Sequence, residues 1–293
     1  MSDGFVNVNK PAGMTSHDAV NRLRKIFGTR KVGHAGTLDP QASGVLPVAV
    51  GSATKFIEYL AAREKSYRAQ ILFGISTDSG DLEGEVIARA ENFIPPTNEQ
   101  LADVLSNFVG EIEQRPPKFS AIKIHGRKAY DLARKNLPFE MPTRRVKIFR
   151  LSLVALTDSI ATVDVECGAG TYIRSLAIDI GESLNLPTTL KSLIRTRVGD
   201  FKLTDALTFD AIEKIGGSCL LPIDVCLNHL PTFELPAHRV RAFMNGLPTT
   251  VAAADEPIVR VKADGKFLGV GRIERGELRS SKIYSTPQDE ATA

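Results

Sequence analysis

The sequence predicts an α+β protein with a mixed, mainly antiparallel sheet flanked by helices and a small β-rich domain at its C-terminal end. Several segments alternate apolar and polar residues as half-buried strands do, and single segments of helical periodicity separate them. Many strands interrupted by single helices are typical of a mixed sheet. After about residue 230, Pro231 and Pro236 mark a linker to a shorter, strand-rich stretch.

Local patterns place the elements in order. Helices are expected where apolar residues recur at helical spacing after a residue that caps them, as at Thr15 or Ser16, at Ser52 and at the capping box opened by Thr97. Residues 65–73 are expected to join a partner strand through a turn-rich segment. The expected strands are residues 4–9, 45–50, 65–73, 85–90, 119–124, 146–156 and 160–167, and the expected helices are residues 16–27, 52–60, 97–108, a short basic helix ending near Asn136, and residues 173–184.

The C-terminal stretch is expected to form its own module of roughly 55 residues, near the lower size at which a domain is stable alone. A short helix over residues 237–245 precedes strands at 258–263, 267–274 and 277–284. Asp264 and Gly265 form a dipeptide that favours a tight hairpin between the first two strands. We therefore divide the chain into residues 1–230, residues 231–285 and a disordered tail, 286–293.

Composition excludes several classes of protein. The chain has 293 residues, 43% hydrophobic and 24% charged, which is ordinary for a globular protein of about two domains. It lacks an apolar run of the roughly 20 residues that cross a bilayer and a signal-peptide pattern, so we expect a cytoplasmic protein without membrane contact. Three cysteines without CxxC spacing and five scattered histidines argue against a disulfide framework and a metal site.

The net charge is only +3, but the basic residues are clustered. Such clusters are either solvated faces or contacts to a phosphate-rich partner. The clusters are Arg22, Arg24, Lys25, Arg30 and Lys31; Lys118, Lys123, His125, Arg127 and Lys128; Arg144, Arg145, Lys147 and Arg150; and Arg195 with Arg197.

The loop of residues 33–47, GHAGTLDPQASGVLP, is the main candidate for chemistry. Its glycines and prolines specify a shaped loop between packed elements, and its single acid is Asp39. A structural turn whose aspartate caps its own backbone would fit the same residues. A lone carboxylate acts as a nucleophile or general base only if it is aimed and kept ionised in a water-poor site, which requires a cationic partner such as arginine.

Arg174 is the candidate partner, because it is a lone cation in the first turn of an apolar helix. An arginine with a packed stem and a hydrated head fits that position equally well. Tyr67, at the start of an alternating strand, would also fit as an ordinary core residue.

Two other motifs give little evidence of function. Ser52 and Lys55 match the SxxK pattern of serine acyl-enzymes, but the companion motifs are missing. Residues 168–170 resemble a dinucleotide-binding turn but lack its third glycine.

Five segments taken together resemble one family over nearly the whole chain, the TruB-type tRNA pseudouridine synthases of bacteria. Ala35 and Ser43 stand where many relatives carry threonine, and neither change removes a reacting group. The segments are GHAGTLDPQASGVLP (33–47), KSYRA (65–69), QRPPKFSAIKIHGRKAYDLAR (114–134), GAGTYIRSLAIDIG (168–181) and LIRTRVGDF (193–201), and NKPAGMTSHDAV (9–20) fits as well.

The resemblance implies the pseudouridine synthase fold followed by a PUA-type RNA-binding domain. It implies an enzyme that flips uridine 55 out of the T loop of tRNA, breaks its N1 glycosidic bond and rejoins C5 to the ribose without a cofactor. The T arm of tRNA would be the partner, gripped by an insertion at about residues 114–142, and nothing implies a protein partner or more than a monomer.

The resemblance also assigns the site. Asp39 matches the essential aspartate, which would attack C1′ or C6 or assist proton removal from the sugar. Arg174 matches the arginine paired with it, and Tyr67 matches the tyrosine that stacks on the flipped uracil. The remaining substrate contacts would be His34, Tyr172, Leu193 and, near the rim, Lys10. Residue types alone do not distinguish between these three ways in which Asp39 could act, or between the intermediates that each would form. The sequence also leaves open a non-catalytic RNA-binding or tRNA-folding role.

Overall fold

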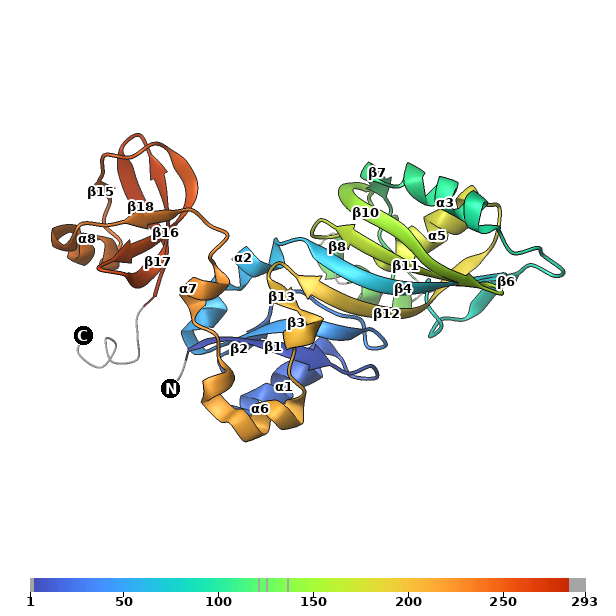
Figure 1. The fold of residues 1–293 in the computed structure, drawn as a ribbon, viewed down its shortest axis with the longest axis horizontal. Coiled ribbons are helices and arrows are strands. Elements are labelled where there is room, and N and C mark those ends of the chain that lie inside the picture. The colour runs from blue at the N-terminus through green and yellow to red at the C-terminus, as the bar shows by residue number, and fades with distance from the viewer. Residues whose placement is uncertain (1–2, 121, 125, 136, 285–293) are drawn as a thin grey trace.

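The computed structural model describes residues 3–284 except 121, 125 and 136. The tail expected at 286–293 and the helix end expected near Asn136 lie outside the described residues. A nine-stranded sheet forms the larger part of the described chain (Figure 1). Its order is β1 (Gly4–Lys10), β3 (Ser43–Val50), β12 (Thr188–Val198), β4 (Lys65–Phe73), β11 (Ile160–Cys167), β10 (Arg144–Thr157) and β7 (Gly110–Gln114), with β2 (Val32–His34) paired to β3 and β13 (Phe201–Lys202) paired to β12.

The expected fold class is confirmed. All pairings in this sheet are antiparallel except the short parallel pairing of β3 with β12, which joins Ile194 to Ser43 and Arg195 to Gly44. The sheet is therefore mixed and mainly antiparallel. The parallel junction connects the N-terminal strands to the rest of the sheet, and the loop that carries Asp39 leads directly into it.

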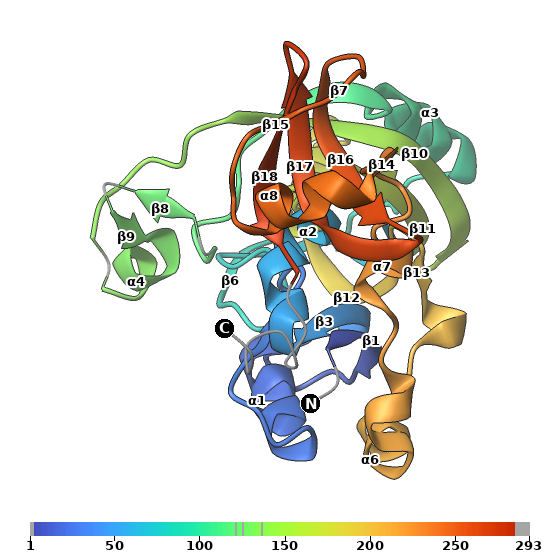
Figure 2. The same cartoon turned by 90° about the vertical axis from the view of Figure 1, so that its left-hand side faces the viewer.

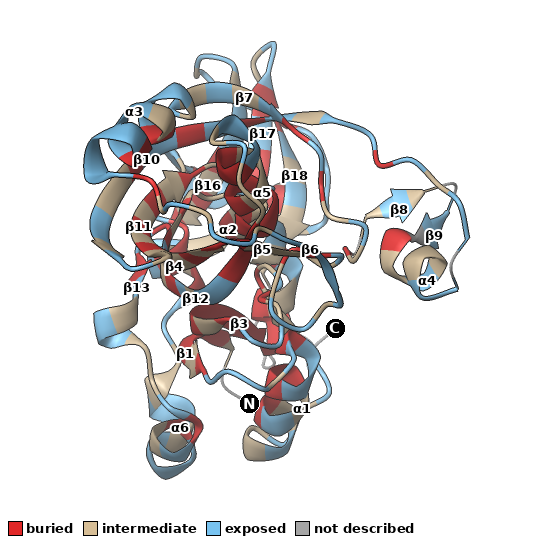
Figure 3. Ribbon diagram, turned by 90° about the vertical axis from the view of Figure 1, so that its right-hand side faces the viewer, coloured by how far each residue is buried: buried red, intermediate tan, exposed pale blue. Residues whose placement is uncertain are grey.

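Helices cover the sheet where their apolar residues meet it. Helices α3 (Asn98–Asn107) and α5 (Ile173–Ser183) pack on β4, β11 and β10, and α5 is largely buried (Figure 3). Helices α1 (Ser16–Ile26) and α6 (Phe209–Ile215) pack on β1 and β3. The capping boxes at Thr15 and Thr97 are both formed, as expected.

Three local expectations are wrong. Ser52 does not cap a helix: it lies inside a 3-10 helix, Gly51–Phe56, which precedes α2 (Ile57–Ala61), and its N–H donates to Asp3. The partner of residues 65–73 is not the next strand, because β4 pairs with β12 and β11 while β6 (Val86–Arg89) pairs with β5 (Ile75–Thr77). The strand expected at 119–124 shrinks to β8 (Lys123–Ile124).

The segment that follows β7 projects from the sheet as a small separate unit (Figure 2). It contains the two-residue strands β8 and β9 (Arg127–Lys128) and helix α4 (Ala129–Arg134). Its first residues remain attached to the sheet, because Ser175 of α5 donates to the carbonyl of Arg115 at 2.7 Å. One end of this segment is therefore fixed beside α5.

A second, five-stranded sheet holds its own core together with α8 (Val240–Met244). It also contacts the first sheet's helices, since the ring of Phe267 packs edge-on against Phe56 at 5.5 Å and Lys282 pairs with Glu58 at 3.3 Å. The strands are, in order, β14 (Thr232–Glu234), β16 (Glu256–Ala263), β17 (Lys266–Glu274), β18 (Glu277–Ile283) and β15 (Thr249–Thr250).

Candidate active site

The loop of residues 35–42 carries the candidate catalytic residue Asp39 and is called the catalytic loop below. Several groups packed against it hold its backbone in place. Ser16, the first residue of α1, both donates to the Leu38 carbonyl at 2.9 Å and accepts from the Leu38 N–H at 2.8 Å. The N–H of Gly13 donates to the Pro40 carbonyl at 2.9 Å. Gly36 has a φ of +113°, a conformation that glycine adopts without strain. The loop is thus a fixed element that presents Asp39 outward.

Asp39 and Arg174 form an ion pair, with Asp39 Oδ2 3.0 Å from Arg174 Nε. The Arg174 side chain is only 6% exposed, and its terminal nitrogens donate to the carbonyls of Ser79 at 3.0 Å and Phe119 at 3.1 Å. Asp81 lies 3.7 Å from the same Nε atom. A guanidinium fixed on both sides in this way holds a carboxylate in one orientation.

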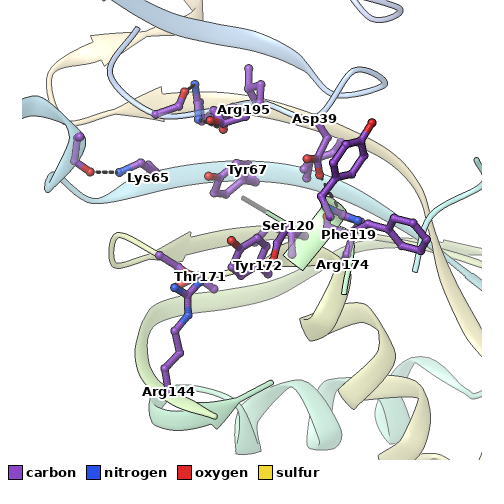
Figure 4. Close-up of a pocket in the computed structure, with 18 residues that line it drawn as sticks. Asp39, Lys65, Tyr67, Phe119, Ser120, Arg144, Thr171, Tyr172, Arg174 and Arg195 are labelled. Carbon is purple, nitrogen blue, oxygen red and sulfur yellow. Dashed lines mark hydrogen bonds and ion pairs between the residues drawn. The ribbon is translucent and has the colours of Figure 1, made fainter. Parts of the chain in front are cut away.

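A cavity of about 470 Å³ opens beside this pair (Figure 4). Tyr67 of β4 and Leu193 of β12 line it from the sheet, and Tyr172 lies at the start of α5. Phe119 and Tyr130 reach it from the projecting segment. One cavity therefore unites a carboxylate, a buried arginine and several aromatic rings.

Tyr67 is a neutral phenol in this cavity. Its side chain is 7% exposed, and burial raises its pKa to about 12, although the nearby Arg195 charge acts in the opposite direction. Tyr172 is oriented from two sides. Gln114 of β7 bonds both its backbone N–H and its carbonyl, at 2.8 and 3.0 Å, and the Arg144 guanidinium lies 4.6 Å from the centre of its ring.

Two residues assigned to substrate contacts do not line the cavity. Lys10 does not reach the cavity rim: it is fully buried, and its amine donates to the carbonyls of Pro11, Met14 and Pro40 at 2.8, 2.6 and 3.2 Å. His34 is half-buried in β2 and does not line the cavity. Burial lowers the pKa of His34, as do the charges of Arg195 and His17.

The expectation of a water-poor site is only partly met. The Asp39 side chain remains 39% exposed, whereas Arg174 and Tyr67 are buried. A ligand that filled the cavity would cover this carboxylate and exclude water from it. No site role was assigned from the sequence to Gln114, Asp81, Lys65 or Arg195. Gln114, Lys65 and Arg195 lie inside the motifs that carry the resemblance, and only the fold shows that they are buried.

Lys65 of β4 lines the cavity beside Tyr67 (Figure 4). Its amine donates to the carbonyls of Ala61 and Arg63 at 2.8 and 2.6 Å. Burial, followed by the Arg195 charge, lowers its pKa to about 8, and the same two causes in the same order lower the pKa of Lys10 to about 8. Two lysines near the catalytic loop thus have pKa values of about 8, well below the ordinary 10.5.

No helix among the described residues is long and apolar enough to cross a membrane. Among the same residues, no group of three or more acidic, histidine or cysteine side chains is arranged to hold a metal ion. The site described above thus consists of the Asp39 carboxylate, paired with Arg174, at a cavity with aromatic walls.

Comparison with known proteins identifies the family. A model described as TruB family pseudouridylate synthase (N terminal domain) matches residues 24–173, and one described as Pseudouridine synthase II TruB, C-terminal, matches residues 231–282. Proteins named tRNA pseudouridine synthase B are similar over almost the full length. The one from Azoarcus sp. (strain BH72) is 40% identical, covering 97% of this chain and 95% of its own. The one from Moorella thermoacetica is 42% identical, covering 92% and 94%.

Solved structures share the fold. A structure described as a Cbf5-Nop10-Gar1 complex aligns with a TM-score of 0.74 at 26% identity, covering 98% of this chain and 86% of that one. An H/ACA RNP bound to a substrate RNA containing 2'-deoxyuridine aligns with a TM-score of 0.74 at 23% identity, covering 97% and 85%. From the two family models and the full-length relatives it follows that this chain belongs to the TruB family of pseudouridylate synthases.

Proposed function

We propose that this chain isomerises uridine 55 in the T loop of tRNA to pseudouridine, with Asp39 as the residue that attacks the target nucleotide. Family membership makes the chain a tRNA pseudouridine synthase; the position in tRNA and the residue roles are our proposal. The observation that supports these roles best is the Asp39–Arg174 ion pair at 3.0 Å on the wall of a cavity that Tyr67 also lines.

The cavity has the size of a small-ligand pocket, within the usual range of roughly 300–1,000 Å³. A base stacked inside folded tRNA cannot reach Asp39, so it has to flip out, at a cost of a few kcal/mol. Stacking against an aromatic ring contributes roughly 1–3 kcal/mol in return. Tyr67 suits this role because it is uncharged and held by the sheet, so its ring does not have to be ordered when the base arrives.

The chemistry requires no external reactant. The bond between N1 and C1′ breaks with its electron pair left on N1, the uracil turns within the cavity, and C5 bonds to C1′. The proton on C5 then leaves to solvent and N1 takes up a proton from solvent, so that product and substrate are isomers. Asp39 acts as a nucleophile whose transient bond to the nucleotide breaks again before the product leaves, and Arg174 keeps its carboxylate aimed throughout. Because Asp39 is 39% exposed without RNA, the flipped nucleotide itself completes the water-poor environment that this step needs.

The remaining assignments concern RNA binding. Residues 114–142 would grip the T arm, since Phe119 and Tyr130 of this segment already line the cavity and the Phe119 carbonyl bonds Arg174. Residues 231–285 would be a PUA-like RNA-binding domain attached to a catalytic domain, residues 1–230. We propose that the chain is a monomer that works in the cytoplasm. Its affinity for tRNA should fall as the salt concentration rises, because phosphate contacts release counterions.

The direct test is to incubate the purified chain with an unmodified tRNA transcript labelled with tritium at C5 of uridine, without cofactor. Release of tritium to water reports rejoining at C5. A transcript with cytidine at position 55 is the control. Release from the first transcript alone supports the proposal; equal release from both places the target elsewhere, and release from neither removes the proposed activity.

Turnover is expected to fall as pH rises through about 8, because Lys10 and Lys65 lose their protons there. A neutral amine makes weaker hydrogen bonds to the carbonyls that it holds, including that of Pro40 next to Asp39. Both pKa values lie below the ordinary 10.5, so unfolding takes up protons between pH 8 and 10.5. The contribution of these lysines to stability therefore rises with pH in that window.

The measurement is the single-turnover rate between pH 6.5 and 9, alongside the midpoint of thermal unfolding. Loss of rate near pH 8 with no parallel loss of thermal stability is the expected result. A rate that falls only where the protein unfolds would contradict it.

A further inference from the structure

Arg195 of β12 is a buried cation that the roles assigned above do not use. Its side chain is 1% exposed, and its guanidinium forms no ion pair with a carboxylate among the described residues. It donates instead to three backbone carbonyls, those of Val45 at 2.7 Å, Thr37 at 3.2 Å and Gly36 at 3.2 Å. Burying an unpaired charge is costly, so a residue kept in this state requires an explanation.

The three carbonyls lie at the two ends of the catalytic loop. Gly36 and Thr37 precede Asp39 by three and two residues, and Val45 lies in β3 just beyond the loop. A single planar guanidinium therefore fixes both ends of the segment that presents Asp39. Arginine suits this position because its donors form a rigid fork and it stays charged at any working pH.

Strand pairing and a register shift determine where the Arg195 side chain points. Arg195 pairs with Gly44 at the parallel junction of β3 and β12, and a Cβ on Gly44 would meet the Arg195 carbonyl oxygen at 2.2 Å. The pairing of β12 with β4 shifts register between Arg195 and Arg197. Such a bulge redirects side chains. Arg197 turns to Glu64 and Glu166, whereas Arg195 turns inward and lines the floor of the cavity.

Arg195 also acts on the groups around the cavity. Its charge lowers the pKa values of Lys10, Lys65 and His34, and it interacts with Tyr67. In Figure 4 Tyr67 lies between Arg195 on one side and Tyr172 on the other. The guanidinium therefore contacts the loop of Asp39 and lies behind the aromatic ring proposed to stack on the base.

We propose that Arg195 is a positioning residue for the isomerisation, which sets the placement of Asp39 by holding both ends of its loop. The proposal rests on the function proposed above. It predicts an effect on the chemical step rather than on tRNA binding, because Arg195 lies beneath the loop and has no exposed surface for phosphate. Misplacing a reacting group by about 1 Å can lower a rate by about 100-fold.

The test uses Arg195→Lys, which keeps the charge but cannot reach three separated carbonyls, and Arg195→Met, which removes the charge. Both should lower the single-turnover rate at saturating enzyme by about 10- to 100-fold, with tRNA affinity within about twofold of the unchanged chain. Arg197→Met is the matched control, an arginine two residues away that loses its ion pairs with Glu64 and Glu166. It should leave the rate unchanged.

Three results would overturn the proposal: an unchanged rate in Arg195→Lys, a loss of affinity without a loss of rate, or an equal loss of rate in Arg197→Met at equal thermal stability. If Arg195→Met does not fold, Arg195→Lys decides alone. The unchanged chain is assayed beside the variants, so failure of the proposed function, which would appear there first, is distinguished from failure of this inference.

Discussion

Asp39→Asn is expected to abolish pseudouridine formation while preserving the fold and the affinity for tRNA. The change is nearly isosteric and removes only the negative charge and nucleophilicity of one exposed side chain. Removal of a residue that acts alone at the reacting bond typically lowers turnover by about 10⁴-fold or more. Binding should persist because the aromatic walls of the cavity and the basic clusters remain.

The fold should persist for a related reason. The catalytic loop is held by Ser16, Lys10 and Arg195 through its backbone, and none of these contacts involves the Asp39 carboxylate. The variant does leave Arg174 without its nearer partner, but Asp81 lies 3.7 Å away and limits the loss. Any drop in thermal stability should therefore be small.

The measurement combines tritium release with a binding assay on the same preparation. Asp164→Asn is the matched control, because Asp164 is also an aspartate paired with an arginine, Arg68, at 2.8 Å, but outside the cavity. It should turn over normally. Retained turnover in Asp39→Asn would remove Asp39 from its proposed role, and a loss of tRNA binding would reassign it to recognition.

The sequence predicted what local chemistry determines. A loop rich in glycine and proline around one acid was predicted as the site, and Asp39, Arg174 and Tyr67 do line one cavity. Tyr172 and Leu193, which also line it, were assigned only through the family resemblance. The capping boxes and the hairpin at residues 264–265 depend on neighbouring residues alone, and they form as expected. Ser52 is the exception, because the preceding strand leads straight into a 3-10 turn that Asp3 satisfies instead.

What escaped prediction depends on contacts distant in sequence. Strand β12 was not recognised, because polar and charged residues such as Lys191, Ser192 and Arg197 interrupt its apolar pattern. Yet β12 is central in the sheet and supplies both Leu193 and Arg195. Lys10 was expected at the rim, and only the fold brings the Pro40 carbonyl, 30 residues away, to its amine. A cation in a sequence motif gives no sign of whether it faces RNA or backbone.

Arg174→Met is the second large effect, with turnover expected to fall by about 10²- to 10³-fold and tRNA affinity changing by no more than a few fold. Arg174 is 6% exposed, so it offers little surface to a phosphate. Without it, Asp39 and Asp81 would lie near each other with no cation between them. Asp39 would then lose both its orientation and the partner that favours its charged form.

The loss should also extend to the projecting segment, because the same guanidinium bonds the Phe119 carbonyl. Arg174→Lys restores the charge with a single amine that cannot serve Asp39, Ser79 and Phe119 together, so it should recover only part of the rate. Arg68→Met removes the arginine of the matched surface pair with Asp164 and should change neither quantity.

Single-turnover rates at saturating enzyme, compared with dissociation constants, separate the two possible roles of Arg174. A loss mainly of affinity would make it a phosphate ligand and would leave Asp39 without its proposed aiming partner. A loss mainly of rate would mean that one buried guanidinium links three parts of the chain that are distant in sequence: the catalytic loop, the hairpin at Ser79 and the projecting segment at Phe119. Docking of the segment on RNA would then be coupled directly to the alignment of the reacting carboxylate.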